Sequence, residues 1–112
     1  MLKLYGLPHC DSCRAARKAL DAAGIAHEFI DLRAAPPDAD TLGHWLDALG
    51  EQALVNRRST TWRGLDETAR RQPTLSLLAA EPTLIKRPVL TEGKRVHCGG
   101  RERDWLAFAQ TR

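Results

Sequence analysis

The sequence predicts one α/β domain with a mixed four-stranded sheet and a helical insertion between a βαβ unit and a ββα unit. A strand, an alanine-rich helix and a second strand follow one another within about thirty residues, the usual length of a βαβ unit. Helical patterns then cover about residues 38–81. Two short apolar strands and a last helix complete the chain, whose 112 residues fit a single domain over 1–112.

The first three elements form the predicted βαβ unit. Residues 2–6, LKLYG, read as a short strand in which Leu2, Leu4 and Tyr5 are apolar and which Gly6 and Pro8 end. Asp11 or Ser12 can cap the helix that follows, and Gly24 is a favourable stop for it. Residues 27–32, HEFIDL, form the second strand. Two strands joined by a helix in this way pair in parallel.

The middle of the chain predicts helices. The loop RAAPPDAD, residues 33–40, contains two prolines that block regular structure, and Asp38 or Asp40 can open the next helix. Four apolar residues recur at helical spacing on one face of TLGHWLDALG, namely Leu42, Trp45, Leu46 and Leu49. Residues 66–72 and 74–80 predict two further short helices, which Pro73 separates.

The C-terminal part predicts a hairpin and a helix. Val89 and Leu90 form one strand, residues 95–98 form the other, and Gly93 supplies the turn. Residues 102–110 then predict a helix with an apolar side. By alternation with Val96, the third cysteine of the chain, Cys98, should face the core as a small buried apolar residue.

Composition limits the classes of function. Hydrophobic residues make up 43% of the chain, enough for one core, and no apolar run approaches the roughly 18–20 residues of a membrane helix. The N-terminus lacks the features of a signal peptide, so we expect a cytoplasmic protein. A net charge of +3 suits small anions but is too weak to indicate direct binding of nucleic acid. Nothing in the sequence requires a partner subunit, so we expect a monomer.

The pair Cys10 and Cys13 is the strongest chemical signal. Cys10 falls where a strand ends and a helix begins, and the free N–H groups and dipole of a helix start stabilise a thiolate. The pKa of Cys10 should therefore lie below the free value of about 8.5. Cys13 lies one turn deeper, near enough for a disulfide, so Cys10 would attack and Cys13 would resolve the adduct. Arg14 and Arg17 add positive charge nearby in the sequence.

Two other interpretations of the cysteine pair remain. A zinc site would need two more ligands, and the remaining close pair, His97 and Cys98, would point to opposite sides of a strand. Buried structural thiols are the second alternative. The context of a strand, a CxxC motif and a helix favours redox chemistry and predicts no metal site.

Four segments resemble the arsenate reductase ArsC/Spx/YffB family, most closely its YffB-like branch. They are YGLPHCDSCRAARKAL, LVNRRSTTWRGL, LIKRPVL and HCGGRERDWLAFA, and together they extend over nearly the whole chain. The resemblance implies a thioredoxin-like fold with a helical insertion. It also implies that Cys10 is the nucleophile and that Arg87 faces the cysteine loop and binds an anion.

Further site residues are implied by the same resemblance. Pro88, which follows Arg87, is usually cis in thioredoxin-like folds. Arg57 or Arg58, in VNRRST, and Arg101 would complete the anion site. Arginine suits this role because its planar fork makes paired hydrogen bonds to oxyanions and carboxylates.

The resemblance implies a reductase that uses no bound cofactor. We expect a glutathione-dependent thiol–disulfide reductase, with arsenate reductase activity as the related chemistry and glutaredoxin or thioredoxin as candidate partners. The alternative is an Spx-like regulator that binds the RNA polymerase α subunit and uses CxxC as a redox switch. The two-cysteine loop departs from YffB-like members, which often have a single cysteine there, and so leaves both branches open.

Overall fold

A computed structural model describes residues 1–111, and one mixed sheet organises them. Its strands are β1 (Leu2–Gly6), β2 (His27–Asp31), β3 (Val89–Glu92) and β4 (Arg95–Cys98), in the order β2-β1-β3-β4. β1 pairs in parallel with β2 and antiparallel with β3, which pairs antiparallel with β4. The predicted mixed four-stranded sheet is therefore confirmed.

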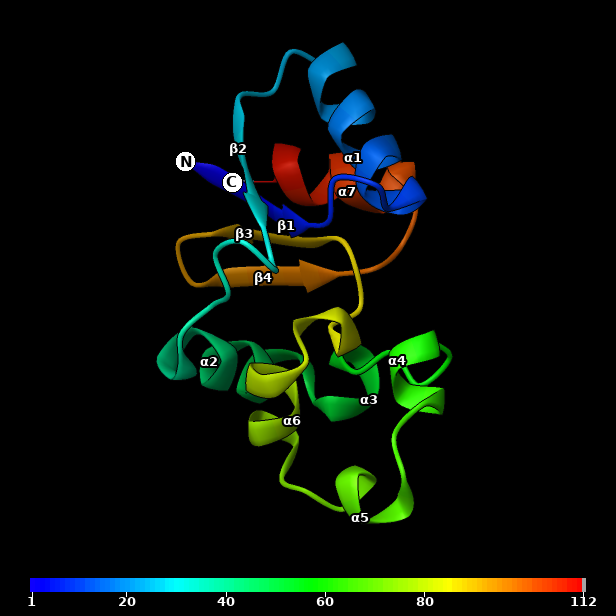
Figure 1. Cartoon of the computed structure of the whole chain (residues 1–112). Coiled ribbons are helices and arrows are strands. Elements are labelled where there is room, and N and C mark those ends of the chain that lie inside the picture. The colour runs from blue at the N-terminus through cyan, green and yellow to red at the C-terminus, as the bar shows by residue number, and fades with distance from the viewer. Residues whose placement is uncertain (112) are drawn as a thin grey trace.

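Helices cover both faces of this sheet (Figure 1). α1 (Asp11–Ala22) and α7 (Glu102–Gln110) lie together on one face. The helical insertion lies on the other face, between β2 and β3 in the chain. It consists of α2 (Ala39–Leu49), α3 (Glu51–Leu54), α4 (Thr60–Arg63), α5 (Glu67–Arg70), α6 (Thr74–Ala80) and the 3₁₀ helix η1 (Pro82–Leu84). The thioredoxin-like α/β fold with a helical insertion is thus confirmed.

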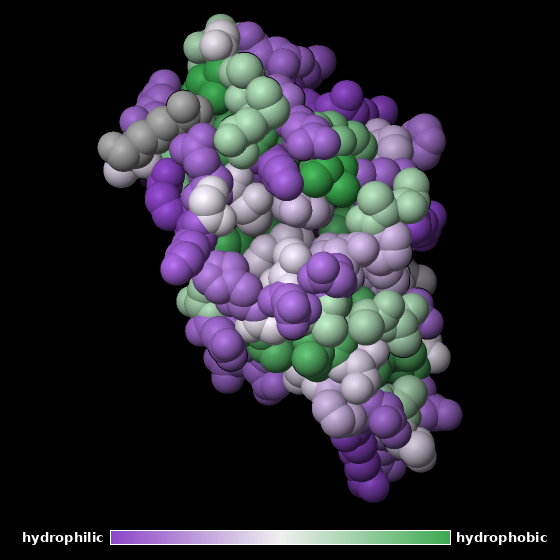
Figure 2. All heavy atoms as spheres, turned by 90° about the vertical axis from the view of Figure 1, so that its left-hand side faces the viewer, coloured by the Kyte–Doolittle hydropathy of each residue, from purple (hydrophilic) through white to green (hydrophobic). Residues whose placement is uncertain are grey.

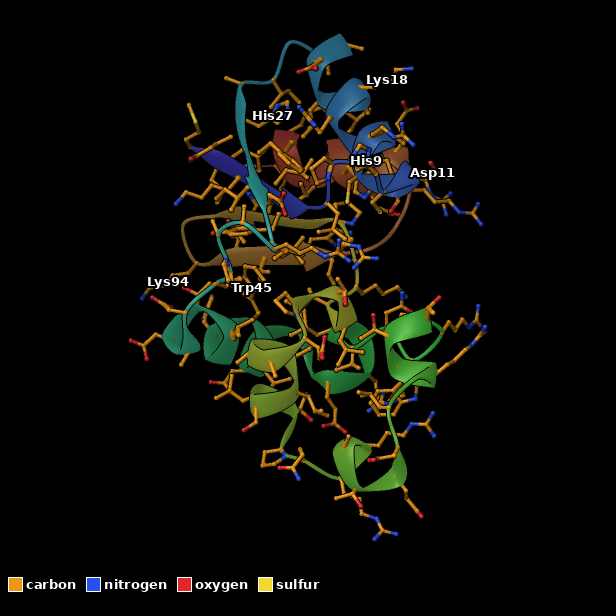
Figure 3. The ribbon with its side chains drawn as sticks, viewed as in Figure 1. His9, Asp11, Lys18, His27, Trp45 and Lys94 are labelled. Atoms are coloured by element: carbon orange, nitrogen blue, oxygen red, sulfur yellow. The ribbon has the colours of Figure 1, made fainter. Side chains whose placement is uncertain are left out.

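The sheet separates two apolar cores because neighbouring strand residues point to opposite faces. Leu90 of β3 packs against α1 and α7 with Leu4 and Trp105. Its neighbour Val89 packs on the other side, in the core of the insertion, which contains Trp45. Figure 3 shows Trp45 between α2 and the sheet, where its ring meets Tyr5 of β1 edge-on at 4.7 Å. The insertion is therefore anchored to the sheet by its own core.

The structure differs from the sequence prediction mainly inside the insertion. The helix predicted over 66–72 is a single turn, α5, which begins after its N-cap Asp66. The turns α3 and α4 were not predicted as separate helices. Each has four residues, too few to show a hydrophobic period, and α4 depends on a cap in which Ser59 accepts a hydrogen bond from Trp62. β3 also runs to Glu92, two residues beyond Leu90.

The molecule is elongated, with extents of 45 × 26 × 23 Å. Figure 2 shows one long face, on which hydrophobic residues occur as separate patches among hydrophilic ones. Within the described part of the chain, no helix is both long and apolar enough to cross a bilayer.

Candidate active site

Cys10 occupies the N-cap of α1, directly after the loop that leaves β1. Its backbone is extended, with φ −84° and ψ 125°, and its carbonyl accepts the first helical hydrogen bond from Arg14 at 2.9 Å. Its own N–H donates to the carbonyl of Leu7 at 3.2 Å, which closes the loop. The sulfur is therefore held beside the free N–H groups of the first helical turn.

Ser12 places a hydroxyl beside the Cys10 sulfur. Its Oγ lies 3.2 Å from the Sγ of Cys10 and 3.5 Å from the carbonyl oxygen of Arg87. A hydroxyl has one proton to donate. When Cys10 is ionised, its thiolate is the nearer and more strongly charged acceptor, so the Ser12 hydroxyl stabilises the thiolate.

Opposing effects set the acidity of Cys10. Burial raises its pKa, whereas hydrogen bonds from the Ser12 hydroxyl, from the backbone and thiol of Cys13, and from the Arg87 side chain lower it. The hydrogen bonds prevail, and the pKa of Cys10 falls from 9.0 to about 7. A half-buried thiol of this acidity is substantially ionised at neutral pH and is a competent nucleophile.

Cys13 lies behind Cys10 in a space that Gly6 leaves open. The residue is fully buried, and a Cβ placed on Gly6 would overlap the Cys13 sulfur and lie 3.1 Å from its Cβ. Burial is the main cause that raises the pKa of Cys13 to about 12, and hydrogen bonding to Cys10 and the charge of that sulfur add to it. Cys13 is therefore a protonated thiol at neutral pH.

Arg87 approaches the same sulfur from the loop before β3. Its Nη1 donates to the carbonyl oxygen of Thr83 at 2.8 Å, which fixes the guanidinium, and its hydrogen bond to Cys10 contributes to the lowered pKa of that thiol. The Arg87 Nε is buried and has no hydrogen-bond partner within residues 1–111. The peptide bond between Arg87 and Pro88 is cis, as the resemblance implies.

A pocket of about 490 Å³ opens in front of the Cys10 sulfur. Its lining residues are Leu7, Pro8, His9, Cys10, Asp31, Arg33 and Arg87. Figure 3 shows His9 and Asp11 at the N-terminal end of α1, where the β1–α1 loop forms one wall. A hollow of about 520 Å³ between α2 and the β3–β4 hairpin has no cysteine among its described lining residues, so the thiol chemistry belongs to the Cys10 pocket.

The structure brings Cys10, Cys13 and Arg87 together but leaves the three other arginines predicted for the site outside the pocket lining. Arg57 forms an ion pair with Glu51 at 3.6 Å, and its guanidinium lies 5.3 Å from the ring centre of Trp62. Arg58 and Arg101 are exposed. The lining of the pocket includes none of the three, so their binding of an anion stays a prediction.

Two neighbouring arginines and the third cysteine also lie outside the pocket. Arg14 pairs with Asp11 at 3.0 Å, and Arg17 lies 4.4 Å from the ring centre of Phe29. The side chains that lower the pKa of Cys10 are those of Ser12, Cys13 and Arg87. Cys98 packs against the insertion core and donates to the carbonyl oxygen of Ala53 at 3.1 Å. No group of three or more potential metal ligands occurs among the described residues.

Three site residues were not predicted from the sequence: Ser12, beside the Cys10 sulfur, and the pocket-lining residues Asp31 and Arg33. Ser12 was considered only as a helix cap, although its place between the two cysteines puts it in the first turn beside the N-cap thiol. Asp31 ends the second strand of a parallel pair, and Arg33 follows it. Because the carboxyl ends of parallel strands meet at one edge of the sheet, that position was the available signal for both residues.

Comparisons with known proteins identify the family and the fold of the chain. Residues 5–108 match the model of the ArsC family. An uncharacterised protein of Haemophilus influenzae is 37% identical over 96% of this chain and 97% of its own length. The global transcriptional regulator Spx of Streptococcus mutans is 26% identical over 96% of this chain and 82% of its own length.

Solved structures give the same result. The YFFB protein has a TM-score of 0.90 at 34% identity and covers 97% of this chain and 99% of its own. An arsenate reductase (ArsC) related protein from Brucella melitensis has a TM-score of 0.75 at 31% identity and covers 97% of this chain and 94% of its own.

Proposed function

The chain belongs to the ArsC family, and we propose that it is a thiol-dependent oxidoreductase that reduces glutathione-linked disulfides with Cys10 as the nucleophile. One observation carries the proposal: a half-buried thiol with a pKa of about 7 opens onto a pocket that it shares with the Arg87 guanidinium. The proposal places the protein in the cytoplasm, where thiols are kept reduced.

The first step is attack on a mixed disulfide. The Cys10 thiolate attacks the glutathionyl sulfur of a disulfide between glutathione and a second thiol compound. A bond forms between Cys10 and glutathione, the original disulfide bond breaks, and the second compound leaves as a thiolate that takes a proton from water. Hydrogen bonds from Ser12 and Arg87 keep Cys10 ionised before this step.

The second step discharges the adduct. A second glutathione thiolate attacks the glutathionyl sulfur, oxidised glutathione leaves, and the electron pair of the broken bond returns to Cys10 as a thiolate. Cys13 is the internal alternative, since its attack on Cys10 would release glutathione and leave a Cys10–Cys13 disulfide. Its full burial and its pKa of about 12 disfavour that route, so we assign the second step to glutathione.

The size and charge of the pocket support glutathione over a small oxyanion as substrate. A volume of about 490 Å³ lies in the range, roughly 300–1,000 Å³, of pockets that hold ligands of several functional groups. An arsenate ion would fill a small part of it. The pocket cation Arg87 suits either an oxyanion or a carboxylate, so arsenate reduction is the related activity to be assayed alongside.

The test measures the ionisation of Cys10 and the discharge of its glutathione adduct separately. Alkylation of Cys10 by iodoacetamide, followed by mass spectrometry across pH, should give an apparent pKa near 7. Glutathione-dependent reduction of a glutathionylated peptide should be abolished in Cys10→Ser and retained in Cys13→Ser. A Cys10 pKa at or above that of a free cysteine would contradict the proposal. A Cys13→Ser protein that accumulates the Cys10 adduct in excess glutathione would instead assign the second step to Cys13.

A redox-switched regulator is the second candidate. Its support is the similarity to proteins named as the regulator Spx, together with two cysteines one helical turn apart. In this alternative a Cys10–Cys13 disulfide would control binding to the RNA polymerase α subunit. A pull-down with the purified α subunit, under oxidising and reducing conditions, tests it; absence of binding in both removes this candidate and leaves the reductase.

A further inference from the structure

The end of β2 and the residues after it form part of the wall of the Cys10 pocket. Gly6 of β1 pairs with Asp31 of β2, and the N–H of Leu32 donates to the carbonyl of Gly6 at 2.9 Å. This pairing fixes the start of the β2–α2 loop beside the start of the Cys10 loop. Asp31 and Arg33 therefore line the same pocket as the nucleophile.

Asp31 shapes the turn that presents Arg33. Its Oδ1 accepts hydrogen bonds from the backbone N–H groups of Arg33, at 2.9 Å, and of Ala34, at 3.4 Å. Both bonds use one carboxylate oxygen, and a carboxylate has two oxygens with several acceptor positions. The second oxygen, Oδ2, makes no hydrogen bond or ion pair to another described residue.

Arg33 carries a free positive charge two residues away. Within residues 1–111 its guanidinium makes no ion pair and no side-chain hydrogen bond, and its residue is exposed. Asp31 and Arg33 thus bring opposite charges to one pocket without pairing with each other. The group that complements both is one with a cation and an anion close together.

We propose that Asp31 and Arg33 recognise a zwitterionic α-amino acid group, with Asp31 binding its ammonium and Arg33 its carboxylate. This inference rests on the proposed use of glutathione, whose γ-glutamyl end carries such a group. Arg87, the second arginine of the lining, is then the partner of the remaining carboxylate, that of glycine. Asp31 and Arg33 act as specificity-determining residues, and the reaction at Cys10 does not pass through them.

The pocket contains the charges that this arrangement requires and little else that is polar. Its titratable lining groups are His9, Cys10, Asp31, Arg33 and Arg87. Without Asp31, two arginines would select any dianion. With Asp31, a dianion that lacks an ammonium brings a negative charge toward an unpaired carboxylate, which is unfavourable. The pair therefore separates glutathione from simple dicarboxylates and oxyanions.

Binding of S-methylglutathione tests the inference without any chemistry, because its sulfur cannot exchange. Calorimetry should show about tenfold weaker binding for both Arg33→Ala and Asp31→Asn, the size expected for one charge-assisted contact. Asparagine keeps an oxygen for the turn, so Asp31→Asn removes the charge and leaves the loop in place. Arg103→Ala, an exposed arginine of α7, is the matched control and should bind as the wild type does.

A ligand variant completes the cycle. S-methyl glutaryl-cysteinyl-glycine lacks only the ammonium, so it should bind the wild type about tenfold more weakly and show no further loss with Asp31→Asn. Unchanged binding of S-methylglutathione in Asp31→Asn and Arg33→Ala overturns the inference, as does no binding to the wild type. Iodoacetamide alkylation of Cys10 in the same proteins reports the thiol chemistry separately. If Cys10 reacts like a free cysteine while S-methylglutathione still binds, the proposed reaction is rejected and the recognition site is kept.

Discussion

The sulfur of Cys10 lies 3.2 Å from the hydroxyl oxygen of Ser12, two residues further along the chain. This contact joins the N-cap of α1 to its first turn and brings a proton donor to the nucleophile. The same hydroxyl lies 3.5 Å from the carbonyl oxygen of Arg87, so it also connects α1 to the loop before β3. Ser12 is therefore the side chain that links the Cys10 end of α1 to the Arg87 loop.

Replacing Ser12 with alanine should raise the pKa of Cys10. Burial raises this pKa, and the Ser12 hydroxyl is the group that lowers it most. A hydrogen bond to a charged group contributes about 1.5–3 kcal/mol, or roughly one to two pKa units. Alkylation rates of Cys10 against pH give the measurement. Ser76→Ala, at an exposed serine of α6, is the control. Identical profiles for Ser12→Ala and the wild type would show that the hydroxyl does not donate to the thiolate.

The cysteines also predict how stability depends on pH. The pKa of Cys10 is lowered from 9.0 to about 7 by folding, so its contribution to stability is present above pH 9 and is lost as the pH falls through 7. The pKa of Cys13 is raised to about 12, so its contribution is present below pH 9 and is lost as the pH rises toward 12. Of these two thiols, only Cys10 therefore changes the free energy of unfolding between pH 7 and pH 9.

Urea unfolding at several pH values measures this effect. The midpoint of the wild type should rise relative to that of Cys10→Ser between pH 7 and pH 9, because serine does not titrate there. Cys98→Ser should run parallel to the wild type over the same interval, because burial raises the pKa of Cys98. A constant difference between the wild type and Cys10→Ser would contradict the lowered pKa.

The elements that position the nucleophile could be predicted from the sequence because they are locally determined. The strand pattern of 2–6 and the helix start at residues 11–12 lie within a few positions of Cys10, although the N-cap of α1 is Cys10 itself rather than the predicted Asp11 or Ser12. The direction of the pKa shift of Cys10 could be predicted from its place at a helix start, but the Ser12 and Arg87 hydrogen bonds that contribute to it could not. Arg87 could be assigned to the site only through the resemblance, since nothing local to IKRPVL indicates Cys10 as its neighbour.

The remaining parts of the site depend on contacts between distant segments. Ser12 approaches Arg87 across 75 positions of the chain, and Arg33 reaches the pocket only because β2 pairs with β1. The four-residue helices α3 and α4 likewise depend on packing in the insertion core, which includes Leu54, Val55 and Trp62. A short polar or mixed segment carries too little periodic signal to predict such contacts.

Arg87→Ala should reduce protection of Cys10 by anions more than the loss of any other arginine predicted for the site. Arg87 lines the pocket, whereas Arg57, Arg58 and Arg101 do not. Arsenate or sulfate at fixed concentration should slow alkylation of wild-type Cys10, and Arg87→Ala should weaken that protection about tenfold. Arg87→Lys should recover part of it, since lysine keeps the charge without the fork.

Alanine variants of Arg57, Arg58 and Arg101 are measured in the same assay. Arg57 already engages Glu51 and Trp62, so its loss should change anion protection little. A loss in any of the three as large as that of Arg87→Ala would contradict this expectation, and would mean that the arginine enters the site when an anion binds, as the family resemblance implies.

Gly6→Ala tests the packing that holds Cys13 behind the nucleophile. The new Cβ would overlap the Cys13 sulfur, and neither β1 nor α1 can move away without loss of the core that Leu4 and Leu20 share. Overpacking of this kind costs about 1–3 kcal/mol of unfolding free energy. Gly43→Ala is the matched control: nothing lies within 4 Å of its Cβ position in α2, so alanine there should stabilise by roughly 0.5–1 kcal/mol.

A double variant separates overpacking from a change in backbone preference. Cys13→Ala removes the sulfur that the new methyl group would meet, so adding Gly6→Ala to it should cost much less than adding Gly6→Ala to the wild type. Some cost should remain, because the Cβ atoms of the two residues would still stand 3.1 Å apart. Equal costs in both backgrounds, measured by urea unfolding, would mean that the requirement for glycine at position 6 comes from the strand and not from the buried thiol.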